Sequence, residues 1–100
     1  MTPVNLEIHP LAIAEARAAR RWYHRRSAMI AQRFLAELDR AVSRITSAPQ
    51  SFSSYLHGTR FLRLARFPYL IVYEDTPTVV HIIADAHAKR RPGYWRRRVS

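Results

Sequence analysis

The hydrophobic pattern of this chain changes from a helical to a strand period near residue 50, and this change restricts the possible folds more than any other feature. From Pro10 to Pro49, apolar residues recur every three to four positions, which is typical of amphipathic helices. Beyond Gly58, they alternate with polar residues or form short continuous runs, which is typical of strands. Helical segments followed by a group of strands indicate an α+β fold.

Two helices are predicted in the first half of the chain. The first spans residues 10 to about 25 and begins at Pro10, which suits the first turn of a helix. Its apolar face is predicted to consist of Leu11, Ala14, Ala18 and Trp22. The second begins after a plausible N-cap, Ser27, and stops before Pro49, with Glu37 among the charged residues that fall off its apolar stripe. That stripe is formed by Ile30, Phe34, Leu38, Ala41 or Val42, and Ile45. The short linker makes the two helices an antiparallel hairpin.

One strand is predicted before the helices and three after them. Strand-like patterns cover residues 4–8, 59–67, 69–74 and 79–87. Residues 49–58 are rich in Ser and read as a loop. We therefore expect a single domain over residues 1–100 with the element order β-αα-βββ. In this fold, the helical hairpin packs on a small antiparallel sheet, and a basic C-terminal tail follows.

The last predicted strand has two different faces. A period of two turns its uniformly apolar face toward the helices, and this face is formed by Val80, Ile82, Ala84 and Ala86. The polar face, away from the helices, carries His81, Asp85 and His87. These three could be metal ligands or an acid–base cluster, but their strand spacing is not a strong ligand signature and the chain has no cysteine. We expect neither a metal nor a cofactor, and interpret the three as the solvated side of the sheet.

The charge of the chain is its most unusual bulk property. Seventeen basic residues, sixteen of them Arg, stand against seven acidic ones and give a formal net charge of +10. Because guanidinium groups match phosphate and carboxylate in geometry, this excess implies a polyanionic partner: RNA, DNA or an acidic protein segment. The absence of cysteine, of an apolar run near the about 18 residues of a membrane span, and of a basic leader predicts a cytoplasmic protein without a membrane contact.

The basic tail, HAKRRPGYWRRR at residues 87–98, holds the best candidate site. Cleavage of a phosphodiester without a metal needs cations on the phosphate and side chains that move protons. His87, Arg90, Arg91 and Tyr94 could fill these roles, and Trp95 or Tyr94 could stack on a base. Alternatively, Tyr94 and Trp95 anchor the tail on the sheet, which we favour for Trp95. Trp22 and Tyr23 on the first helix are expected in the core.

Arginines on the strand at 59–67 are further candidates for binding an anion. Arg60 and Arg66 share one face of that strand, whereas Arg63 takes the other, so the three do not line one groove without a bulge. They could equally keep an exposed strand soluble and prevent edge pairing.

Taken together, the pattern resembles the RelE/ParE toxin superfamily of bacterial type II toxin–antitoxin modules. The segments that carry the resemblance are EARAARRWYHRRS (15–27), RFLAELDRAVSRITSAP (33–49), TRFLRLARFPYLIVYE (59–74) and AHAKRRPGYWRRR (86–98). The resemblance implies a small α+β toxin that arrests growth. It also implies a cognate antitoxin whose acidic, partly disordered segment folds onto the toxin, with oligomers formed only through that complex.

The superfamily implies two different mechanisms. RelE-like members cleave mRNA in the ribosomal A site without a metal, and the matching positions here would be Arg60 or Arg63, then His87, Arg91 and Tyr94. ParE-like members inhibit DNA gyrase and lack a catalytic set. This chain departs from the nuclease pattern in having almost no Lys, and both branches stay open. A non-toxic or degenerate domain that binds nucleic acid or an antitoxin is the alternative from another class.

Overall fold

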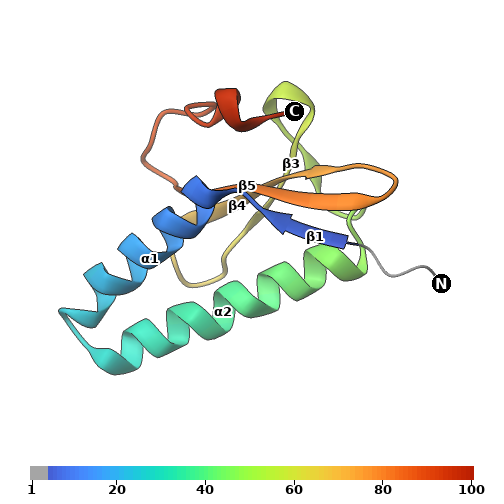
Figure 1. The fold of residues 1–100 in the computed structure, drawn as a ribbon. Coiled ribbons are helices and arrows are strands. Elements are labelled where there is room, and N and C mark those ends of the chain that lie inside the picture. Colours follow the sequence, from blue (N-terminus) through green and yellow to red (C-terminus); the bar gives the residue numbers. More distant parts are fainter. Residues whose placement is uncertain (1–4) are drawn as a thin grey trace.

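The computed structural model describes residues 5–100, and in it a helical hairpin covers one face of a five-stranded sheet (Figure 1). This arrangement confirms the α+β class and the order β-αα-βββ; Val4, predicted in the first strand, lies outside the described residues. No helix in the described part is both long and apolar enough to span a membrane. The helices and strands are β1 (Asn5–Ile8), α1 (Pro10–His24), α2 (Ala28–Ser47), β2 (Ser53–Ser54), β3 (Arg60–Arg63), β4 (Tyr69–Asp75) and β5 (Val79–His87).

The sheet is mixed, with the strand order β1-β5-β4-β3-β2. The three strands predicted after the helices pair antiparallel, as predicted; β2, which lies in the predicted loop 49–58, adds a fourth antiparallel strand, whereas β1 pairs parallel with β5. The long helical connection after β1 allows this, because only tight hairpins force antiparallel neighbours. β3 ends at Arg63, before the predicted residue 67, and the backbone N–H of Arg66 instead donates to the Glu37 carboxylate on α2 at 2.8 Å. Glu37 is therefore buried, in contrast to the prediction.

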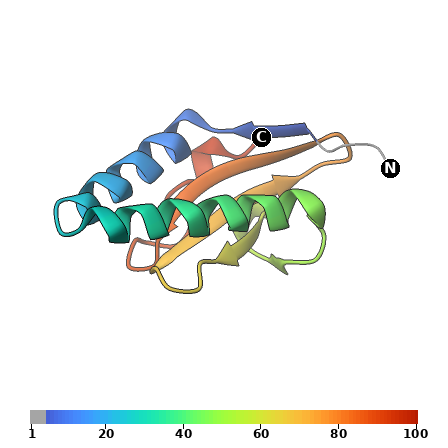
Figure 2. The same ribbon diagram turned by 90° about the horizontal axis from the view of Figure 1, so that it is seen from below.

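Helix α2 begins at its predicted cap and buries most of its predicted stripe, although Ile30 is 38% exposed. The Ser27 hydroxyl accepts a hydrogen bond from the Ile30 N–H and caps the helix. Phe34, Ala41 and Ile45 are buried against the sheet. Figure 2 shows both helices lying across the same face of the sheet, joined by a short turn.

Helix α1 buries a different face from the predicted one. Ala12 and Ala19 are in the core and Tyr23 packs against it, whereas Leu11 and Trp22 are 50% and 47% exposed. The prediction that Trp22 lies in the core was therefore wrong. Small alanine side chains let the helix approach the sheet closely, and α1 carries them on both sides, so periodicity alone did not identify the buried face.

A β-bulge in β5 reverses the alternation of its side chains. Val72 pairs with Ala84 and Tyr73 pairs with Ile82, so Ile83 is an extra residue without a partner on β4. Up to the bulge, Ile82 meets the helices as predicted. Beyond it, Ala84 packs on the opposite face of the sheet. Asp85 and His87 then lie on the helical side, which corrects their predicted placement; a single inserted residue is enough to exchange the two faces.

The C-terminal tail folds back over the sheet face that the helices leave open (Figure 1). Trp95 is only 1% exposed and anchors the tail in a second core cluster. Gly93 adopts a φ of 83°, and a Cβ at this position would lie 3.3 Å from the His57 ring. The tail is therefore packed on the sheet as a layer of the fold. Of the two roles considered for Trp95, the structure agrees with that of an anchor for the tail.

Candidate functional site

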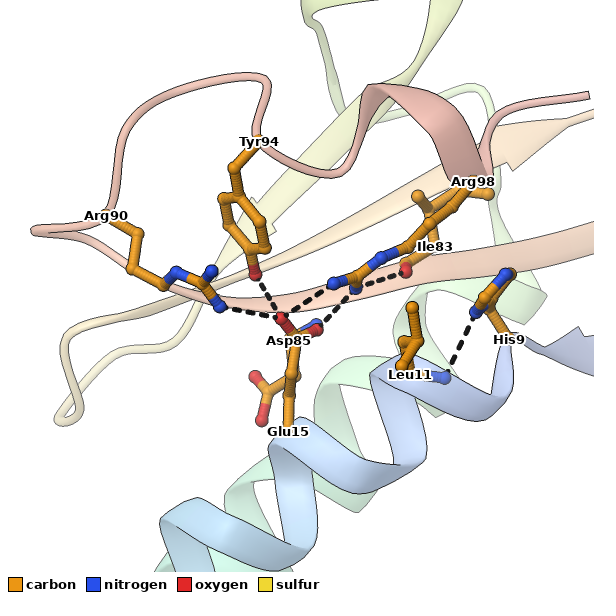
Figure 3. A network of polar contacts seen from close by, with 8 residues as sticks. All are labelled: His9, Leu11, Glu15, Ile83, Asp85, Arg90, Tyr94 and Arg98. Carbon is orange, nitrogen blue, oxygen red and sulfur yellow. Dashed lines mark hydrogen bonds and ion pairs between the residues drawn. The ribbon is translucent and has the colours of Figure 1, made fainter.

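The carboxylate of Glu15, on α1, connects the helical layer to the tail (Figure 3). It is mostly buried, with its side chain 15% exposed. Its two oxygens accept hydrogen bonds from five donor groups. These are the Tyr94 hydroxyl, Arg98 Nη1 at 2.8 Å, Arg98 Nη2 at 3.3 Å, Arg90 Nη1 at 3.3 Å and the backbone N–H of Asp85 at 3.2 Å.

This network satisfies backbone groups of β5 at the part of its edge where β1 no longer pairs with it. The β1 strand ends at Ile8, and the His9 N–H makes the last backbone bond, to the Ile82 carbonyl. Beyond that point, Glu15 accepts from the Asp85 N–H, and Arg98 donates to the Ile83 carbonyl at 3.2 Å. Two side chains thus satisfy the backbone groups that an unpaired edge would leave open.

Asp85 is the most unusual ionisable group of the site. It is 4% exposed, and neither of its carboxylate oxygens has a hydrogen-bond partner among the described residues. In Figure 3 its carboxylate lies beside the Glu15 side chain, away from the dashed contacts. Burial, and then the nearby Glu15 charge, raise its pKa from 3.8 to about 7. This carboxyl therefore exchanges its proton near neutral pH.

A cavity of about 480 Å³ opens between α1 and the adjoining ends of β4 and β5. Its walls include four aromatic or imidazole rings, two carboxyls and one guanidinium: Trp22, Tyr23, Tyr69, His87, Glu15, Asp85 and Arg90. Burial, followed by the charges nearby, raises the pKa of Tyr69 to about 12. The cavity brings together acid–base groups from elements far apart in the sequence.

Two predicted site residues line this cavity, and a third lies beside it. The His87 Nδ1 accepts from the Lys89 N–H at 3.0 Å, and its ring packs edge-on against Tyr69. The Arg90 guanidinium lies 3.6 Å from the centre of the Tyr94 ring. The Tyr94 hydroxyl is held by Glu15; burial first, and then this hydrogen bond, raise its pKa above the ordinary value.

The other predicted site residues are not in the cavity wall. Arg91 is exposed in the turn that begins the tail. Arg60 donates to the Phe52 carbonyl at 2.7 Å, and Arg63 is exposed at the end of β3. Trp95 is buried in the core cluster on the opposite side of the sheet from the helices. Their roles in binding or catalysis stay predictions.

The described residues contain no group of three or more His, Cys, Asp or Glu that could hold a metal ion. His81 pairs with Glu74 at 3.4 Å, and the bulge separates it from Asp85 and His87. The two residues that sequence reasoning missed are Glu15 and Arg98. One signal pointed to Glu15: it is the single acid between Glu7 and Glu37.

Comparison with known proteins identifies the family. No curated protein matches the sequence. The fold is similar to a solved structure titled "Chromosomal ParDE TA system from P. aeruginosa", with a TM-score of 0.76, 15% sequence identity, and coverage of 87% of this chain and 98% of that one. The family profile described as "ParE toxin of type II toxin-antitoxin system, parDE" matches residues 6–92. Since this match spans most of the chain, the protein belongs to the ParE toxin family of type II toxin–antitoxin systems.

Proposed function

We propose that this ParE-family toxin arrests growth by binding and inhibiting DNA gyrase, without cleaving RNA. The observation that carries the proposal is the position of Tyr94, the best candidate for proton transfer in the tail. Its hydroxyl already donates to Glu15, and Arg98 donates to the same carboxylate. The chain belongs to the ParE family. The superfamily resemblance described above implies gyrase inhibition for ParE-like members, which supports the same mechanism.

The acid–base chemistry of the tail supports inhibition by binding. A general acid or base must reach the reacting proton and have a pKa near the working pH. The pKa of Tyr94 is raised further from neutrality, and Trp95, the candidate for base stacking, is buried beneath the tail. These two side chains stabilise the tail on the sheet and leave little chemistry for a cleavage step.

One observation favours ribosome-dependent mRNA cleavage as a second candidate. The cavity contains His87, Arg90 and the buried Asp85, whose pKa is raised to about 7. A carboxyl that exchanges protons near neutral pH, in the same cavity as an imidazole and a guanidinium, offers acid–base groups for phosphodiester chemistry. The cleavage mechanism therefore predicts that His87→Ala abolishes toxicity, whereas the gyrase mechanism does not.

We also propose a cognate antitoxin as the partner that neutralises the toxin. The net charge of +10 favours an acidic segment, because opposite charges speed association and disordered acidic chains fold readily onto basic surfaces. The similar solved structure is titled as a ParDE system, which supports a ParD-like partner.

The test combines a purified supercoiling assay with mapping of cellular mRNA 5′ ends shortly after induction. We expect inhibited supercoiling, intact mRNA, and inhibition retained by His87→Ala. The opposite result would be new 5′ ends within codons that disappear in His87→Ala, together with unaffected supercoiling. It would identify the ribosome, and not gyrase, as the target. Expression without any growth arrest would instead indicate a degenerate toxin that only binds its antitoxin or nucleic acid.

A further inference from the structure

The end of the helical hairpin where α1 meets α2 carries cations without any acid. Residues 16–36 contain six Arg and one His, and no Asp or Glu. Four of these arginines, from the middle of α1 to its C-cap, are exposed and form no ion pair among the described residues: Arg17, Arg20, Arg21 and Arg25. Figures 1 and 2 both show this end of the hairpin projecting beyond the sheet, so a large ligand can reach it.

The cations of this end surround a hollow. It has a volume of about 270 Å³ and is lined by Arg20, Arg21, His24 and Arg25 alone. In the tail, by contrast, Arg90 and Arg98 donate to Glu15, which neutralises part of the tail charge. The hairpin end therefore gathers uncompensated cations around one hollow, while Arg91, Arg96 and Arg97 remain as exposed cations on the tail.

Helix stability does not account for this arrangement. Arg17, Arg21 and Arg25 follow one another at i, i+4 spacing, and like charges at this spacing destabilise a helix. The helix dipole favours cations in the last turn, which explains Arg21 but not Arg17, one turn before it. An external anion bound to this row would offset the repulsion.

An exposed aromatic side chain follows Arg21 in the same turn of the helix. Trp22 is 47% exposed at the wall of the cavity beside α1, and the Arg26 guanidinium stacks over its ring at 3.4 Å. Flat aromatic and guanidinium surfaces beside a row of cations are the combination by which proteins hold nucleic acid: arginines on phosphates, rings against bases. A free phosphate ion has no flat surface that could stack on the Trp22 ring, whereas a nucleic acid has its bases.

We propose that the hairpin end, defined by Arg17, Arg20, Arg21, Trp22, His24 and Arg25, binds the phosphodiester backbone of a nucleic acid. This inference goes beyond gyrase inhibition, because it concerns a direct contact of the isolated toxin with the polymer. It assigns the contact to the hairpin and not to the tail, where the sequence places the densest run of cations.

The test measures the binding of the purified full-length protein to fluorescein-labelled duplex DNA and to single-stranded RNA by anisotropy over a series of KCl concentrations. The variant Arg21→Gln/Arg25→Gln removes two cations from the hairpin. Its matched control, Arg96→Gln/Arg97→Gln, removes two exposed cations from the tail with the same change in net charge. All four arginines are on the surface, and circular dichroism verifies that both variants fold.

We expect the hairpin variant to lower the slope of log affinity against log salt by about 2 on duplex DNA, because each lost phosphate contact contributes about 0.9. The tail variant should keep the slope of the unmodified protein. Tighter binding of the duplex or of the single strand would identify which polymer the surface prefers. An equal loss in both variants, or no binding by the unmodified protein even at low salt, would overturn the proposal, and neither result depends on gyrase.

Discussion

Replacing Asp85 by Asn should change how the stability of the protein depends on pH. The Asp85 carboxyl is buried without a hydrogen-bond partner among the described residues, and burial raises its pKa from 3.8 to about 7. Asn has nearly the same shape and no charge. The substitution therefore removes the cost of ionising a buried group and leaves the packing close to unchanged.

The size of the effect follows from the two pKa values. Going from 3.8 to about 7 is a gap of about 3 units, and each unit corresponds to about 1.36 kcal/mol, which gives about 4 kcal/mol. Between these values, folded Asp85 keeps a proton that the unfolded chain has lost. Its contribution to stability is thus complete below about pH 4 and is lost as the pH rises to about 7.

The assay is urea unfolding of both proteins across this pH range, with the free energy of unfolding of Asp85→Asn compared with that of the unmodified protein. Relative to the unmodified protein, the free energy of unfolding of the variant should rise by about 4 kcal/mol between the acidic and the neutral end of the range. Any fixed cost of burying the Asn amide is the same at every pH and cancels. Asp39→Asn removes an exposed carboxylate and controls for net charge. A difference that stays constant with pH would refute the reasoning, since Asp85 would then have found a partner in solution.

Two further substitutions test the packing of the tail and of α1. Glu15→Ala leaves the Arg98 guanidinium and a backbone N–H without their acceptor, so it should lower the free energy of unfolding by about 2–3 kcal/mol and loosen the tail; Glu15→Gln, which keeps one acceptor oxygen, should cost less. A loss under half a kcal/mol would show that the network is dispensable. Trp95→Ala should cost about 3–5 kcal/mol, whereas Trp22→Ala should cost less than about 1 kcal/mol, as measured by chemical unfolding. Comparable losses would place Trp22 in the core after all.

The sequence predicted those parts of the fold for which several local signals agree. Helix α2 has a broad apolar stripe, a serine N-cap and a proline beyond its end; its bounds match the prediction, and Phe34, Ala41 and Ile45 of the predicted stripe are buried. Helix α1 has alanines around most of its surface, so Ala12 and Ala19 were no better candidates for the core than Ala14 and Ala18. Where alanines lie on more than one side of a helix, tertiary packing determines which side is buried.

The candidate site was harder to predict, because its geometry depends on two features that leave no local trace. A bulge needs only one residue without a partner, and the β-branched run around Ile83 contains no glycine or proline that would indicate one. The Glu15 network joins residues 70 to 83 positions apart. Tail residues such as Tyr94 could be named as polar candidates, but not assigned to that carboxylate.

The distribution of charge follows from these two features together. The bulge turns the Asp85 carboxyl toward the helices, while the backbone N–H of the same residue meets Glu15 at the edge of β5. Glu15 then holds Arg90 and Arg98, so part of the positive charge of the tail stabilises the fold. The arginines at the far end of α1 have no comparable acid, because residues 16–36 contain none. The net charge of +10 is therefore not equally accessible to a partner over the whole surface. In the tail, Arg90 and Arg98 are bound to Glu15 and hold the tail on the sheet, whereas the arginines of the hairpin end are exposed to solvent.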